Sequence, residues 1–318
     1  MDRCVAYKYE DISLVPEYST LISRGNARTE VTLGKKRLKL PVIPANMKSV
    51  INEDIAEWMS DNRYMYIMHR FDVDTYKFVL NANKKDWNII SISVGVQPAD
   101  YDLIRKIADD KLDVDFITID IAHGHHVFIK NTIGFIKEKL PNTFVIAGNV
   151  ATKQAVKDLA EWGADYAKVG IGQGHVCTTK DKTGYTYPMF TCTRECSTGD
   201  IPIIADGGVR CNGDIAKAIA AGGHMVMAGS LFSACLDSPG ENVTLAGGKI
   251  GKKYFGSASE KNKGNKRHIE GVEKIIESNY MTYAEKLAEI KEDLQSSISY
   301  AGGNNLSAIR KSNYIINY

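Results

Sequence analysis

The sequence lacks the segments that would place it in a membrane or on an export route. No apolar run approaches the roughly 20 residues that a membrane-spanning helix requires. The first residues, Met1 to Val5, have neither the basic segment nor the apolar core of a signal peptide. These two absences favour a cytoplasmic protein.

Other absences narrow the function classes. The net charge of +2 argues neither for nor against nucleic acid, but no block of basic residues with interleaved aromatics occurs. We therefore expect no dedicated nucleic-acid surface. The six cysteines include no C-x-x-C pair, and the spacing of Cys192 and Cys196 does not resemble a zinc knuckle. Free thiols in a reducing compartment are the simple interpretation.

Short apolar runs recur along the 318 residues, and they are near-continuous rather than alternating. Such runs suit parallel strands that are buried on both faces. The spacing between most neighbours accommodates one strand, one helix and two loops. The eight runs cover residues 41–46, 64–69, 89–95, 116–122, 144–150, 166–171, 202–208 and 225–231.

Amphipathic segments of helical type lie between these runs, at 55–61, 101–109, 128–139, 152–162 and 213–221. Eight strand–helix repeats predict a (β/α)8 TIM barrel. A doubly wound sheet, the competing architecture, would usually have fewer strands and a glycine fingerprint after the first one.

We expect one catalytic domain over residues 1–318, without an inserted regulatory domain. After the eighth strand the chain becomes rich in Gly, Lys, Ser and Asn over 237–271. A connection of this length is typical of a functional lid or a disordered segment, so we expect a long, mobile lid loop there. A C-terminal helix over 283–297 and a short tail over 300–318 complete the predicted architecture.

Polar or glycine residues follow all eight predicted strands, at the end where a barrel forms its active site. The seventh and eighth ends read Asp206-Gly207-Gly208 and Gly229-Ser230. Their backbone amides and the serine hydroxyl could bind a phosphate, the ligand that barrels often hold at these two loops. Asp206 would repel a phosphate, so we expect its carboxylate to accept hydrogen bonds from ribose hydroxyls.

The sixth predicted strand opens into a loop with glycines at 170, 172 and 174, and this loop leads to Cys177. Glycines allow tight turns and expose backbone amides and carbonyls to a ligand or an ion. A cysteine at the mouth of such a loop can act as a nucleophile. A small buried cysteine in an ordinary turn is the competing interpretation.

Several motifs together closely resemble the GMP reductase branch, of bacterial type, within the IMP dehydrogenase/GMP reductase superfamily. The resemblance covers nearly the whole chain, from Tyr9 to about Arg310. The motifs are Pro41-Val42-Ile43-Pro44-Ala45-Asn46-Met47, Asp120-Ile121-Ala122-His123-Gly124-His125, Gly170-Ile171-Gly172 with Val176-Cys177-Thr178-Thr179, Ala205-Asp206-Gly207-Gly208, Tyr254-Phe255-Gly256-Ser257-Ala258-Ser259-Glu260 and Ser299-Tyr300-Ala301-Gly302-Gly303.

The resemblance implies an NADPH-dependent reductive deamination of GMP to IMP and ammonia, a step in purine interconversion. Cys177 would be the nucleophile that forms a thioimidate at purine C2. Thr179 and Glu270 hold the family's positions for the proton relay. The resemblance also implies a homotetramer.

The resemblance assigns the remaining site residues as well. Substrate binding falls to Asp206, Gly207, Gly208, Gly229, Ser230, Gly256 and Ser257, and NADPH binding to Arg70, Asp120, Ile121, Ala122, Lys266 and Arg267. Backbone carbonyls of Gly172, Gly174 and Cys177 resemble a monovalent cation site, which suits potassium. Two departures lie inside this loop, because Gln173 stands where the family usually has proline and His175 where it has serine or lysine.

Three alternatives stay open on the sequence. An IMP dehydrogenase without its regulatory domain would carry a glutamine in place of Glu270 and an Arg-Tyr pair in a flap, and no convincing pair is present. Asp120, His123, His125 and His126 could belong to a metal-dependent barrel hydrolase. A non-catalytic nucleotide-binding protein would need the glycine loops but not the thiol of Cys177.

Overall fold

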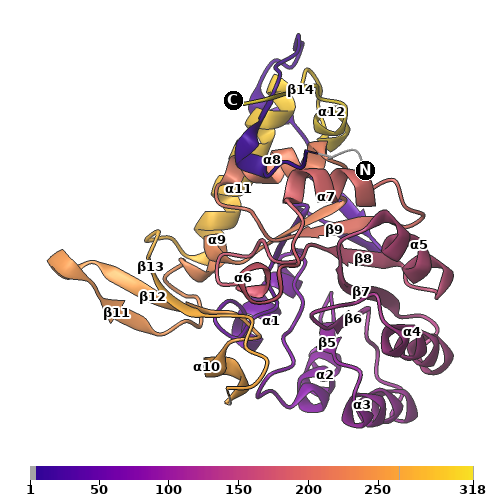
Figure 1. The fold of residues 1–318 in the computed structure, drawn as a ribbon. Coiled ribbons are helices and arrows are strands. Elements are labelled where there is room, and N and C mark those ends of the chain that lie inside the picture. Colours follow the sequence, from indigo (N-terminus) through magenta and orange to yellow (C-terminus); the bar gives the residue numbers. More distant parts are fainter. Residues whose placement is uncertain (1–4, 265, 318) are drawn as a thin grey trace.

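A curled, all-parallel sheet forms the centre of the protein (Figure 1). The computed structural model describes residues 5–264 and 266–317. The sheet has seven strands in the order β4-β10-β9-β8-β7-β6-β5. Their bounds are β4 Val42–Pro44, β5 Ser91–Val94, β6 Phe116–Asp120, β7 Phe144–Val150, β8 Tyr166–Val169, β9 Ile203–Asp206 and β10 Met225–Ala228. The fold is therefore α/β with a curled sheet of the TIM-barrel type, as the apolar runs predicted.

The second predicted strand, over 64–69, is the exception. It makes a single parallel bridge, from Met68 to Ile92 in β5, and does not form a strand. The Met68 amide donates to Ser91 at 3.1 Å, but its carbonyl accepts from the hydroxyl of Ser93 at 2.7 Å. The pairing with β5 does not extend beyond this one bridge, and the run has no strand of its own.

Helices connect successive strands and cover the outside of the sheet (Figure 1). All five predicted helices are confirmed within a few residues, and α2 and α7 occupy two further connections. Their bounds are α1 Glu53–Asp61, α2 Thr75–Lys84, α3 Pro98–Asp109, α4 Val127–Lys139, α5 Lys153–Glu161, α7 Met189–Cys196 and α8 Asn212–Ala220, with short turns at α6 Thr179–Thr183 and α9 Ser230–Ser233. None of the helices in the described ranges is both long and apolar enough to cross a bilayer.

The expectation of a long loop after the eighth strand was wrong over 242–255. This part forms β11 (Asn242–Thr244) and β12 (Ile250–Phe255), with a 3-10 turn at Ala246–Gly248 between them. Together with β13 (Glu273–Glu277) they make a three-stranded antiparallel sheet, which projects from the barrel in Figure 1. β12 pairs with β11 inside the Gly- and Lys-rich segment and with β13 beyond it, so the composition of that segment did not reveal the sheet. Among the described residues of 256–264 and 266–272, the only helical turn is α10 (Glu260–Lys263).

The C-terminal helix α11 spans Tyr283–Tyr300, and Thr282 with Glu285 forms a capping box at its start. The tail is more ordered than expected, because it contains α12 (Leu306–Arg310) and β14 (Tyr314–Ile316). β14 pairs with β1 (Ile12–Leu14), next to the 3-10 turn Tyr9–Asp11. A small hairpin of β2 (Val31–Leu33) and β3 (Lys36–Leu38), after the 3-10 turn Arg24–Asn26, buries Leu33 and Leu38 in the core.

A buried lysine anchors the projecting sheet to the barrel. Lys252 of β12 is 1% exposed, and its Nζ donates to the carbonyls of Leu236 and Ser238 and to Oδ1 of Asn242, at 3.1, 2.9 and 2.8 Å. These three hydrogen bonds use all three N–H donors of the ammonium group, which makes its burial tolerable. The chain continues from this anchor toward Tyr254 and Gly256, which line the cavity described below.

Replacing Lys252 by Met should lower the free energy of unfolding by about 1–3 kcal/mol, because buried acceptors lose their donors. Denaturant unfolding at neutral pH measures this change. Lys253→Met is the matched control, since the neighbouring Lys253 pairs with Glu241 near the surface and should cost less than about 1 kcal/mol. Equal losses in the two variants would contradict the anchoring role.

Candidate active site

One cavity of about 410 Å³ opens at the carboxyl ends of the parallel strands. It gathers sixteen residues that the sequence analysis named: Arg70, Asp120, Ile121, Ala122, Gly172, Gly174, Cys177, Thr179, Asp206, Gly207, Gly208, Gly229, Ser230, Gly256, Ser257 and Glu270. Lys266 and Arg267 are not among the residues that line it. The side chain of Lys266 is 85% exposed, with its Nζ 3.9 Å from Glu260.

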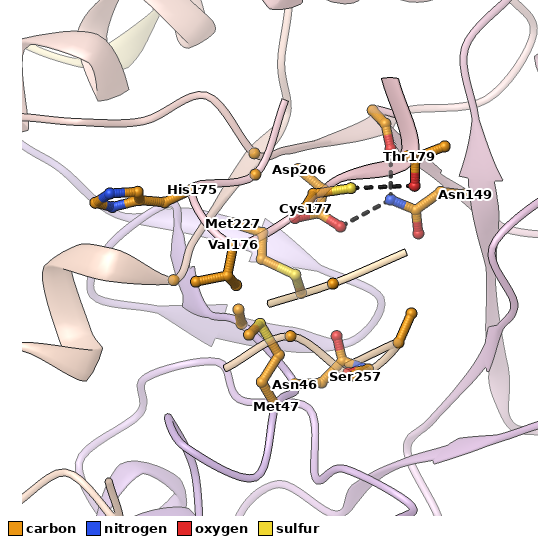
Figure 2. Close-up of a pocket in the computed structure, with 18 of the residues that line it drawn as sticks. Asn46, Met47, Asn149, His175, Val176, Cys177, Thr179, Asp206, Met227 and Ser257 are labelled. Carbon is orange, nitrogen blue, oxygen red and sulfur yellow. Dashed lines mark hydrogen bonds between the residues drawn. The ribbon is translucent and has the colours of Figure 1, made fainter. Parts of the chain in front are cut away.

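A chain of hydrogen bonds joins a thiol, a hydroxyl and a carboxylate inside this cavity. Cys177 Sγ donates to Thr179 Oγ1 at 3.2 Å, and Thr179 Oγ1 donates to Glu270 Oε2 at 2.7 Å. Figure 2 shows the sulfur of Cys177 pointing at the Thr179 hydroxyl. All donors run in one direction, so a proton can pass from the thiol to the carboxylate through the hydroxyl.

Backbone pairing brings Glu270 to a threonine that lies 91 residues earlier in the chain. Cys177 and Gly271 form an antiparallel bridge. On either side of it, the Thr178 amide donates to the Glu270 carbonyl at 2.8 Å and the Val272 amide to the Val176 carbonyl at 2.9 Å. The loop after β8 and the segment before β13 are therefore fixed in register, and Glu270 has no freedom to sit elsewhere.

Gly170 is required where the catalytic loop leaves β8. Its φ is +140°, and a Cβ at this position would lie 2.0 Å from the carbonyl oxygen of Asp206. Only glycine permits both the backbone conformation and this contact. The close approach packs the start of the Cys177 loop against the end of β9, where Asp206 and Gly207 begin the neighbouring loop.

A mostly buried cluster of charges, which the sequence analysis missed, lies in the wall of the cavity. Lys168 of β8 has a side chain that is 4% exposed, and its Nζ lies 3.0 Å from Asp120 Oδ1 and 2.9 Å from Asp206 Oδ2. Asn149 Nδ2 also donates to Asp206 Oδ2, at 2.8 Å (Figure 2). In the sequence Lys168 stands inside an apolar strand, and only its position two residues before Gly170 could have indicated a role.

The charges in this cluster stabilise one another. Burial by itself would raise the pKa of Asp120, but the charge and hydrogen bond of Lys168, together with the charge of Arg70, bring it below its ordinary value. Burial would lower the pKa of Lys168, yet the two carboxylates raise it above its ordinary value. Lys168 and Asp120 are therefore held in their charged forms.

Unpartnered donors mark one end of the cavity as a polar binding surface. Arg70 follows the 64–69 segment, and its Nη2 donates to the Asp120 carbonyl at 3.4 Å. Within the part of the chain that the structure describes, neither the buried Nε of Arg70 nor the buried Nδ2 of Asn46 has a hydrogen-bond partner. Buried donors without partners are costly, so this end fits a ligand rich in hydroxyl, amide and phosphate oxygens.

Gly229, Tyr254 and His175 lie together in another part of the cavity. Gly229 leaves room for the Tyr254 hydroxyl, because a Cβ there would lie 2.2 Å from that oxygen. His175 packs edge-on against the Tyr254 ring, and its buried Nδ1 has no hydrogen-bond partner among the described residues. Burial and then the positive charges of Arg210 and Lys274 lower the pKa of His175. In Figure 2, His175 and Cys177 project from one loop toward opposite sides.

The histidines near Asp120 do not gather as metal ligands. His125 Nε2 contacts Asp158 Oδ2 at 2.6 Å, and the imidazole packs against Trp162. His69 is buried, and burial and then the charge of Lys48 lower its pKa to about 4. Among residues 5–264 and 266–317, no three His, Cys, Asp or Glu side chains are grouped so that they could hold a metal. Nothing in this geometry favours the metal-dependent hydrolase.

The fold and the cavity define an α/β-barrel enzyme that carries a thiol, a hydroxyl and a carboxylate in one hydrogen-bonded chain. A family model described as IMP dehydrogenase / GMP reductase domain matches residues 6–318. The chain belongs to this family of oxidoreductases, which confirms the resemblance noted in its sequence.

Individual relatives agree with the family match over nearly the full length. The GMP reductase of Staphylococcus carnosus (strain TM300) is 49% identical over 313 residues, which cover 98% of this chain and 96% of the relative. That of Mycoplasma mycoides subsp. mycoides SC is 49% identical over 315 residues, covering 98% and 97%. That of Variovorax paradoxus (strain S110) is 48% identical over 315 residues, covering 97% and 95%.

Proposed function

We propose that this protein reduces GMP to IMP and ammonia with NADPH as the hydride donor, a reaction of purine interconversion. The observation that carries the proposal is the hydrogen-bonded chain Cys177–Thr179–Glu270 in a cavity that also gathers the glycines and polar residues of the strand ends. Binding a nucleotide requires no thiol, so this chain of groups favours a catalyst over a non-catalytic nucleotide-binding protein.

The first half of the reaction follows from the direction of the hydrogen bonds. Cys177 passes its proton through Thr179 to Glu270, and the thiolate attacks purine C2. The C2–N2 bond breaks, and the same relay returns a proton so that the amino group leaves as ammonia. A thioimidate then joins Cys177 to C2.

In the second half, bound NADPH would supply a hydride to C2. The C2–S bond would then break, IMP would leave, and the Cys177 thiolate would be protonated by one proton taken up from solvent, because the relay gave its proton to ammonia in the first half. The orphaned donors of Arg70 and Asn46, together with Asp120, Ile121 and Ala122, suit the dinucleotide. We keep Lys266 and Arg267 only as candidates for its more distant parts, since they lie outside the cavity lining.

Glu270 also supports the reductase over its sister, the IMP dehydrogenase. GMP presents two donors on one edge of the base, N1–H and the 2-amino group, and a carboxylate accepts from both. A glutamine would offer one acceptor and two donors, which does not match that edge. The relatives quoted above, all named GMP reductase, favour the same choice.

The nucleotide would lie across the cavity. Its phosphate fits Gly207, Gly208, Gly229 and Ser230, with Gly256 and Ser257 closing over it and Asp206 accepting from the ribose. His175 adds a donor to the phosphate end, where the family usually has serine or lysine. This orientation leads the purine toward Cys177, at the opposite side of the loop (Figure 2).

A potassium ion and a homotetramer complete the proposal. The carbonyls of Gly172, Gly174 and Cys177 would give an ion only neutral oxygen ligands, which suits a hard monovalent cation. Exposed apolar side chains around the projecting sheet, such as Val272, Ile275 and Tyr280, support association of copies. Light scattering of the purified protein tests the tetramer.

The reaction is tested by following NADPH absorbance at 340 nm. We expect GMP-dependent loss of NADPH, with IMP and ammonia as products. Cys177→Ala should abolish it, because no covalent intermediate can form. Production of NADH from IMP and NAD, without the GMP reaction, would mean that the chain is the dehydrogenase.

Glu270→Gln and Thr179→Val should each lower kcat about 10²- to 10⁴-fold, the usual contribution of a proton relay. GMP binding should weaken in Glu270→Gln and change little in Thr179→Val. Thr178→Val is the matched control, since the neighbouring Thr178 hydroxyl is buried without a partner among the described residues. A kcat near that of the wild type in Thr179→Val would rule out the relay.

Replacing potassium in the assay by a bulky ammonium ion such as tetramethylammonium should lower activity several-fold, because a close-fitting carbonyl site does not accept a large cation. Activity is measured with each chloride salt at equal ionic strength. Identical rates with and without potassium would show that Gln173 and His175 have removed the cation requirement.

A further inference from the structure

Lys168 occupies a position between the two halves of the proposed active site. It comes from β8, whereas Asp120 ends β6 and Asp206 ends β9. Its Nζ contacts both carboxylates at nearly equal distances, 3.0 and 2.9 Å, and its side chain is 4% exposed. One ammonium group therefore connects the carboxyl ends of β6, β8 and β9 at the cavity wall.

This inference rests on the function proposed above, in which the two carboxylates bind different ligands. Asp206 lies next to the phosphate loops and would accept from the ribose of GMP. Asp120 lies beside Arg70 and would face the dinucleotide. Lys168 thus contacts one carboxylate from the GMP side of the site and one from the dinucleotide side.

Without Lys168, no cation would lie between the two carboxylates. Both are mostly buried, with side chains 16% and 20% exposed, and like charges at short range in a low dielectric repel strongly. Asp206 would keep the hydrogen bond from Asn149 Nδ2, which holds the same oxygen as Lys168 does. The charge of Arg70 would still favour the ionised form of Asp120, but the charge and hydrogen bond of Lys168 are the larger influences on this carboxylate, so its orientation depends mainly on the lysine.

We propose that Lys168 is a positioning residue that aligns Asp206 for the nucleotide and Asp120 for the dinucleotide at the same time. It acts through these carboxylates and takes no part in the proton relay. Its removal should therefore weaken both ligands together and leave the Cys177–Thr179–Glu270 chain in place.

The test compares four proteins: wild type, Lys168→Met, Lys168→Met with Asp120→Asn, and Lys137→Met. Methionine keeps the volume of the lysine stem and removes the charge. Lys137 is the matched control, because it pairs with Asp165 at 2.6 Å at the amino-terminal end of β8, away from the cavity. Calorimetry measures the affinity for GMP and for NADPH separately, and steady-state assays give kcat and KM.

We expect the dissociation constants of GMP and of NADPH each to rise about tenfold or more in Lys168→Met, the loss typical of a misaligned charge-assisted hydrogen bond. The kcat at saturation should stay within about threefold of wild type, because the relay is intact. In the double variant the repulsion is gone, so GMP affinity should recover while NADPH affinity should not. A loss confined to one ligand, a loss of kcat without a change in affinity, or no recovery of GMP binding would overturn the proposal.

A second readout does not depend on activity. In Lys168→Met, burial and repulsion raise the folded-state pKa of one carboxylate above its unfolded value of about 3.9, so the variant should lose stability as pH rises through that raised pKa. Its unfolding temperature should fall relative to wild type as pH rises above the unfolded-state value of about 4, and the double variant should not show this fall. Parallel curves for all four proteins would overturn the proposal.

The two readouts separate this inference from the proposed function. If the wild-type protein binds neither GMP nor NADPH, the proposed function is wrong. The pH-dependent unfolding would still test whether Lys168 holds the two carboxylates. A wild type that turns over GMP, combined with an unaffected Lys168→Met variant, would contradict only the positioning role.

Discussion

The ion pairs of Lys168 with Asp120 and Asp206 are the interaction on which the active end of the barrel depends. Three charged groups lie almost out of solvent there, and burial of any one alone would be strongly unfavourable. Each is tolerated because the others are in place. Strands β6, β8 and β9 must therefore end in one fixed arrangement, and the loops that leave them start from fixed positions.

Close backbone packing carries this arrangement from the strand ends to the reacting groups. Gly170 lets the Cys177 loop lie directly against the carbonyl of Asp206, and the bridge between Cys177 and Gly271 attaches the segment that carries Glu270. Lys252 holds the projecting sheet from which that segment arises. The thiol, hydroxyl and carboxylate meet because contacts with other parts of the chain hold the Cys177 loop, the Glu270 segment and the projecting sheet in place.

Much of the fold was predictable because its cause is local. Apolar runs such as 116–122 and 166–171 are buried on both faces, and the helices between them carry one apolar stripe each, so periodicity located them. The 64–69 run does not form a strand, because its pairing with β5 is limited to the single bridge from Met68 to Ile92. The projecting sheet was missed because the segment's composition suggested a loop, and one of the two partners of β12, β13, lies beyond that segment.

By itself, the sequence determined the barrel class, the polar strand ends and, through its motifs, the family and the candidate roles of Cys177, Thr179 and Glu270. Tertiary structure alone decided that Glu270 meets Thr179 across 91 residues, that Lys168 lies between two carboxylates, and that Lys266 and Arg267 lie away from the cavity lining. The physical reason is the separation along the chain over which each interaction acts. Hydrophobic periodicity and glycine requirements act between near neighbours, whereas charge pairing and loop docking depend on which strand ends the folded sheet brings together.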